Sequence, residues 1–150
     1  MKFISIYTDA SHNQNHNISS YAFLLANDGI KEVYSDLCPP EITKIHQAEL
    51  LAVYKSILEA KNNNATHICI HTDCHCVIHY LVEKNKRVLR DQCFIDLIIK
   101  TKKLLSTFEG YKIFKIKAHK QGNYSHNCNR EVDKLSRKTL RNYIKVLNKN

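Results

Sequence analysis

The stretch KFISIYTDASHNQNHNISSYAFLLANDGIKEVYSDL, residues 2–37, contains three strand patterns before the first helix pattern. Its first part, Lys2–Asp9, carries apolar and β-branched residues on both alternating faces, which is typical of a strand in the centre of a sheet. A polar segment follows at Ala10–Ser19, and we expect it to form a loop. Two further strand-like runs are joined at Asn27–Gly29, which is a strong hairpin signal. The stretch therefore predicts a central strand followed by two antiparallel ones.

The rest of the chain alternates between helical and extended patterns. Helices are indicated where apolar residues recur at three- and four-residue steps, and strands where they alternate. The expected order of elements is β-β-β-α-β-α-α-β-α. Strands one, four and five are linked through helices and should run parallel, while strands two and three form an antiparallel edge. The predicted fold is a mixed, five-stranded α/β sheet with helices at residues 43–61, 74–85, 91–110 and 129–147.

Composition limits the class of protein. The 150 residues fit one domain, residues 1–150, which is large enough to bury a substantial core. Lys and Arg outnumber Asp and Glu by 23 to 14, which gives a formal charge of +9. This charge favours a polyanionic partner. The charge by itself is also explained by a bias of the composition toward solubility. No apolar run is long enough to span a bilayer and no signal peptide pattern is present. We therefore expect a cytoplasmic monomer with six reduced cysteines and no membrane association.

Four acidic residues fall where this sheet would gather them. Asp9 and Asp73 each end a predicted strand in a Thr-Asp pair, and ligands of open α/β sheets bind beyond the carboxyl ends of strands. Glu49 lies on the sheet-facing side of its helix, and Asp133 opens the last helix. Each acid alone could be a cap or a surface residue. Together they would repel one another without a cation, and hard oxygen ligands suit Mg²⁺.

Four short motifs carry a resemblance to a known family. IYTDAS, HQAELLAV, IHTDC and NREVDKLSR, in that order, resemble the type 1 ribonuclease H family over residues 2 to about 143. The resemblance implies the RNase H-like fold and implies that Asp9, Glu49, Asp73 and Asp133 bind two Mg²⁺ or Mn²⁺ ions. It further implies hydrolysis of the RNA strand of RNA/DNA hybrids. In such chemistry one metal activates water and the second stabilises the leaving 3′ oxygen, which gives 5′-phosphate and 3′-hydroxyl products.

The same resemblance suggests further functional residues. His119 matches a loop histidine, and a group with a pKa near 6.5 can move protons at neutral pH. Telling RNA from DNA requires contact with the 2′-hydroxyl, for which the backbone near Ala10 and the carboxylate of Glu49 are placed. The expected substrate-binding residues are Ala10, Ser11, Asn15, His46, Gln47, His75 and Asn129.

The sequence also departs from the family pattern. Ala10 stands where the family usually has glycine, and the segment after it lacks the usual Gly/Pro-rich loop. The basic segment between the middle helices is short and lacks tryptophan; its cations are Lys84, Lys86, Arg87 and Arg90. We therefore expect a weaker grip on the hybrid with a strong dependence on salt.

Two other functions stay open. One is a catalytically weak or silent module that binds RNA/DNA hybrids with the same fold, against which the presence of all four acids argues. The other is a zinc-dependent binding domain using Cys74, Cys76 and His79, which are good zinc ligands. In a helix starting at Cys74, however, residues 74 and 76 point about 200° apart, so only Cys76 and His79 share a face. Two ligands do not close a zinc site.

Overall fold

The computed structural model describes residues 1–82, 90–116 and 124–149. A single mixed sheet has the strand order β3-β2-β1-β4-β5, in which β1, β4 and β5 are parallel and β2 and β3 are antiparallel. This confirms the predicted sheet and the predicted order of elements. The bounds are β1 Phe3–Asn13, β2 Ile18–Asn27, β3 Ile30–Leu37, α1 Ile45–Asn62, β4 His67–Thr72, α2 His75–Leu81, α3 Gln92–Leu105, β5 Gly110–Lys115 and α4 Tyr124–Asn148.

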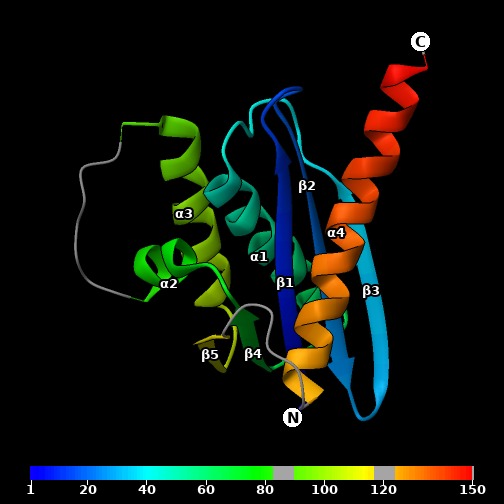
Figure 1. Cartoon of the computed structure of the whole chain (residues 1–150). Helices are drawn as coiled ribbons and strands as arrows, with labels where there is room; N and C mark the ends of the chain where they lie inside the picture. The colour runs from blue at the N-terminus through cyan, green and yellow to red at the C-terminus, as the bar shows by residue number, and fades with distance from the viewer. Residues whose placement is uncertain (83–89, 117–123, 150) are drawn as a thin grey trace.

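Helices cover both faces of the sheet, as Figure 1 shows. On one face α1 packs against β1 and β2, and α3 packs against α1, around a large core that includes Ile4, Ile6 and Phe23. On the other face α4 lies across β1, β2 and β3 and encloses a smaller core around Tyr7 and Leu24. The residues of β1 and β2 alternate between these two cores, which explains why both strands carry apolar residues on both faces. No helix among the described residues is long and apolar enough to cross a membrane.

The β2–β3 connection is the tight hairpin that the sequence predicts. Asp28 and Gly29 both have positive φ, 49° and 81°, as a two-residue type I′ turn requires. Asp tolerates this backbone region better than most residues and Gly adopts it without cost. The hairpin fixes β3 as the antiparallel edge of the sheet.

The expected loop at Ala10–Ser19 is wrong for most of its length. β1 continues to Asn13 and pairs with β2 as far as the Asn13–Ile18 pair, so only Gln14–Asn17 remains as a turn. Polar residues are compatible with a strand here because backbone hydrogen bonds to β2 and side-chain contacts hold the strand in place. The His12 Nδ1 and Ser19 Oγ atoms, for example, lie 2.7 Å apart. Polarity alone therefore gives no sign of a strand.

Two helix boundaries also differ from the predictions. α4 begins at Tyr124 rather than at residue 129, so Asp133 lies well inside the helix instead of opening it. α3 ends at Leu105, and Gly110 begins β5 rather than stopping the helix. The start of α3 is as expected, because the side chain of Asp91 accepts a hydrogen bond from the Phe94 N–H as an N-cap.

Candidate active site

Asp9 and Asp73 reach the same edge of the sheet because their strands are parallel neighbours. The last paired residues of β1 and β4 are Tyr7 and His71, so the next positions in register that face the same way are Asp9 and Asp73. Asp9 is 4% exposed and Asp73 is half-buried, directly after the end of β4. Parallel pairing therefore brings together two acids that lie far apart in the sequence.

Glu49 joins them from α1. It is 6% exposed on the helix face that packs against the sheet. One ligand oxygen from each of Asp9, Glu49 and Asp73 lies within 4.8 Å of the others. The start of α1 is held by Gln47, whose side-chain oxygen accepts from the backbone N–H groups of Thr43 and Lys44, at 3.0 and 3.3 Å. This contact fixes the first turn of the helix that carries Glu49.

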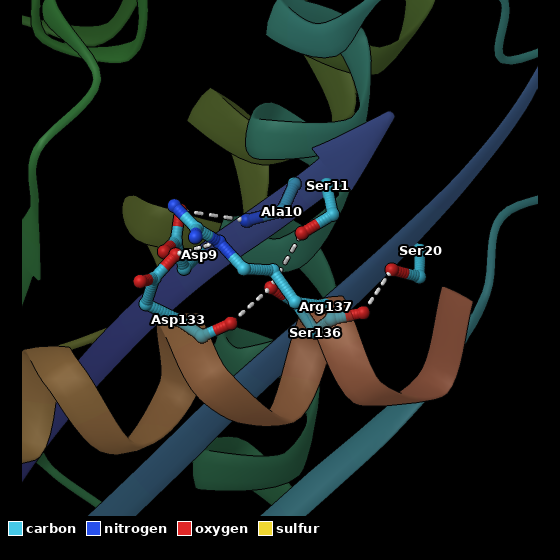
Figure 2. A network of polar contacts seen from close by, with 7 residues as sticks. All are labelled: Asp9, Ala10, Ser11, Ser20, Asp133, Ser136 and Arg137. Carbon is cyan, nitrogen blue, oxygen red and sulfur yellow. Dashed lines mark hydrogen bonds and ion pairs between the residues drawn. The ribbon is translucent and has the colours of Figure 1, made fainter. Parts of the chain in front are cut away.

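Asp133 lies on α4, and it lines a groove at this edge of the sheet together with Asp9, Glu49 and Asp73. Its Oδ1 atom forms an ion pair with Arg137 Nε, 3.0 Å away and one helical turn along. Figure 2 shows the Arg137 guanidinium reaching over this carboxylate on the side where Asp9 lies. Asp133 and Asp9 both line one groove of about 620 Å³. The structure thus places all four predicted acids at one groove, three of them in a tight cluster.

A serine network fixes α4, and with it Asp133, against the sheet. The hydroxyl of Ser136 donates to the Asp133 carbonyl at 3.0 Å, and the hydroxyl oxygens of Ser136 and Ser11 also lie 3.0 Å apart. The hydroxyl of Ser20 donates to the Ser136 carbonyl (Figure 2). These contacts join β1 and β2 to the turn of α4 that carries the fourth acid.

The buried acids are electrostatically strained. Burial, and then the charge of Asp73, raises the pKa of Asp9 from 3.8 to about 8, although the Ala10 N–H donates to Asp9 Oδ1 at 2.9 Å. Burial, and then the charge of Asp9, raises the pKa of Glu49 well above its usual value. The protein therefore holds carboxylates that at neutral pH favour either a proton or a cation.

The residues fit a divalent metal centre. Glu49 Oε2 is buried and has no hydrogen-bond partner among the described residues, which is a costly state for a carboxylate oxygen. Hard oxygen ligands are those that Mg²⁺ and Mn²⁺ prefer. Within residues 1–82, 90–116 and 124–149 the acidic triad is the only group of three or more side chains placed to hold a metal. Cys74 and Cys76 form no such group, and Cys76 is exposed.

Two of the expected substrate contacts line the groove, and two others are exposed outside its lining. Ala10 and Ser11 line it next to Asp9, although the Ala10 N–H is occupied by the Asp9 carboxylate. Asn15 is exposed in the β1–β2 turn, and His75 is exposed at the first residue of α2. The roles of these four residues toward a substrate stay predictions.

The other expected contacts lie differently. Gln47 is 2% exposed, and its amide group contacts the start of α1 and Asp91; its role toward a substrate stays a prediction. His46 is half-buried, with its ring edge-on to Phe94, and burial lowers its pKa. Asn129 is buried on α4, and its Oδ1 has no partner among the described residues. Outside those residues lie His119, Lys84, Lys86 and Arg87, whereas Arg90 is exposed.

The cationic part of the groove was not predicted from the sequence. Arg137 and Arg141 line it beside Asp133, and His12 lines it from β1. Residues 133, 137 and 141 follow each other at steps of four, which places them on one helix face. This spacing is visible in the sequence, but arginines at helical steps are equally typical of a face that meets only solvent.

Comparisons with known proteins agree with this geometry. A family model described as RNase H matches residues 1–141. Among solved structures, the chain is similar to RNase H1 from the halophilic archaeon Halobacterium salinarum, with 17% identity, a TM-score of 0.76, and coverage of 93% of this chain and 98% of the other. It is also similar to the N-terminal RNase H domain of a Mycobacterium tuberculosis protein, solved as a fusion with maltose-binding protein, with 12% identity, a TM-score of 0.77, and coverage of 98% and 99%. At these identities the likeness confirms the fold. No curated protein sequence matches the chain.

Proposed function

Because this chain belongs to the RNase H family, we propose that it is an endonuclease that hydrolyses the RNA strand of RNA/DNA hybrids with two divalent cations, leaving 5′-phosphate and 3′-hydroxyl ends. The observation that carries this proposal is the convergence of Asp9, Glu49 and Asp73 within 4.8 Å. Asp133, on α4, lines the same groove as these three acids. The net charge of +9 suits a polyanionic substrate.

The four carboxylates would hold the cations. Bound divalent cations supply Lewis acidity, which makes water more acidic and stabilises negative charge on a leaving oxygen. The protein prepares the site by burying Asp9 and Glu49, because burial raises the free energy of their unpaired charges. The cluster with a bound cation therefore has a lower free energy than the charged cluster without one. Mg²⁺ and Mn²⁺ both accept such a donor set.

Selectivity for RNA would come from groups beside the acids. A 2′-hydroxyl both donates and accepts a hydrogen bond. The Glu49 carboxylate offers an acceptor in the groove, and the strand backbone at Ala10 lies beside it. The side chain of Ser11 is held by Ser136, so this part of β1 keeps a fixed position against α4. In this proposal these rigid groups recognise the 2′-hydroxyl on the sugars of the RNA strand.

A cleavage assay tests the proposal. The protein should convert the end-labelled RNA strand of an RNA/DNA hybrid to shorter products with Mg²⁺, and leave RNA/RNA and DNA/DNA duplexes intact. Asp73→Asn should abolish cleavage because it removes a charged ligand from the triad. The matched control is Asp96→Asn, which neutralises an exposed acid on α3. Hybrid binding without cleavage by the unsubstituted protein would instead establish a silent binding module.

A further inference from the structure

The groove extends beyond the acidic cluster along α4. Arg137 and Arg141 line this extension and stand one helical turn apart, which is about 6 Å along the helix axis. The side chain of Arg137 is 53% exposed, and Arg141 is exposed. A ligand that enters the groove can therefore reach both side chains.

The charge changes sign along the groove. Among the described residues that line the groove, the acids are the four at the active site, and the others are neutral or basic. Arg137 pairs with Asp133, whereas Arg141 makes no ion pair with any residue in the described part of the chain. A ligand that fits this arrangement has one anionic group that binds a cation held by the acids, and it carries further negative charge beside α4.

The walls combine polar residues from the β1–β2 end with apolar residues from α4. The β1–β2 end contributes the polar residues His12, Asn13 and Gln14. α4 contributes Leu140 and Ile144 between and beyond the arginines. The guanidinium group binds phosphate with two parallel hydrogen bonds, so the two arginines suit the phosphates of a strand that lies in the groove.

We propose that Arg137 and Arg141 bind successive phosphates of the nucleic acid strand that passes the acidic centre, so that α4 sets the position of that strand. This inference rests on the proposed function because it takes the strand to be part of the hybrid. In it Arg137 exchanges its partner Asp133 for a phosphate, which leaves the Asp133 carboxylate to a cation. Arg141 binds the next phosphate along the groove.

Binding measured against salt tests this role without depending on cleavage. Fluorescence anisotropy of a labelled RNA/DNA hybrid is measured from about 50 to 300 mM salt, a range over which phosphate contacts make the affinity depend strongly on salt. Every variant also carries Asp73→Asn, which prevents cleavage during the measurement. Arg141→Ala should weaken binding about tenfold and reduce the slope of log K against log salt by about one. Arg141→Lys should keep the slope, since it keeps the charge. Lys138→Ala removes an exposed charge of α4 that does not line the groove and should change neither.

The outcomes separate this inference from the proposed function. If Arg141→Ala behaves like Lys138→Ala although circular dichroism shows both to be folded, or if the background protein does not bind the hybrid, the inference is wrong. If the slope falls as expected while the unsubstituted protein cleaves no hybrid, the phosphate contact stands and the proposed nuclease activity is wrong. A double variant with Arg137→Ala should lower the slope by about two, and a loss no larger than that of Arg141→Ala alone would remove Arg137 from the phosphate site.

Discussion

Replacing Asp9 with asparagine should stabilise the protein when no metal is bound, and more so as pH rises. The pKa of Asp9 is raised from 3.8 to about 8 by burial and by the charge of Asp73. Between pH 3.8 and about 8, the Asp9 carboxyl is therefore protonated in the folded state and ionised in the unfolded state. Stability of the metal-free protein must fall as pH rises through this window, because the folded state binds more protons than the unfolded state.

The magnitude follows from the size of the shift. About four pKa units at about 1.4 kcal/mol each give roughly 6 kcal/mol above pH 8, and roughly 4 kcal/mol at pH 7. This is comparable with the whole stability of a domain, typically about 5–15 kcal/mol. Asparagine has no charge to desolvate and keeps an oxygen that can accept the Ala10 N–H. The substitution also removes one cause of the raised pKa of Glu49.

Urea unfolding in EDTA from pH 5 to about 8.5 provides the assay. The quantity of interest is the difference in unfolding free energy between Asp9→Asn and the unsubstituted protein, because titrating histidines and cysteines cancel in it. This difference should grow with pH, while Asp96→Asn, at an exposed acid, should give a flat difference near zero. Mg²⁺ at about a hundred times its Kd should restore about 2.7 kcal/mol to the unsubstituted protein. Parallel curves for the two proteins would refute the claim that Asp9 is strained by burial.

Two further predictions concern the packing that supports the site. Ser136→Ala removes a hydroxyl that contacts Ser11 and the α4 backbone, so the unfolding free energy should fall by about 1–2 kcal/mol. The control Ser106→Ala, at an exposed serine, should change it by about 0.5 kcal/mol or less. Equal effects of the two substitutions would mean that the serine network does not stabilise the protein. A Cβ at Gly110 would lie 2.8 Å from His67 Cδ2, so Gly110→Ala should lower the unfolding free energy by about 1–3 kcal/mol in urea unfolding. Adding His67→Ala should recover part of this stability. If the losses from the two substitutions are simply additive, the proposed clash is wrong.

Much of the fold is predictable because local patterns and chain connectivity determine it. Helical crossovers impose parallel strands, so the neighbouring positions of Asp9 and Asp73 follow from the order of elements alone. The phase of the apolar residues in α1 is enough to place Glu49 on the inner face of that helix. These inferences need only short-range periodicity and the rules of sheet topology.

The failures share a different physical cause. The strand at Ala10–Asn13 is stabilised by its ladder with β2, and the burial of Gln47, which the sequence did not indicate, comes with its contact to Asp91, 44 positions away. Neither contact leaves a local signature, because a polar side chain looks the same whether it faces a partner or solvent. The Arg137–Arg141 face was missed for the same reason. Only the packing of α4 across the sheet turns that face toward the acids.

One helix supplies both the fourth acid and the cations of the groove, and this arrangement has a mechanical consequence. Asp133 and Arg137 share one turn of α4, and Ser136 on that turn is bonded to β1 and β2. Any shift of α4 therefore moves a proposed metal ligand and a proposed phosphate ligand together relative to Asp9. A variant that loosens the serine contacts should weaken cation binding and hybrid binding in parallel, whereas Arg141→Ala should weaken hybrid binding alone. The two effects can be separated only because Arg141 lies one turn beyond the anchored part of the helix.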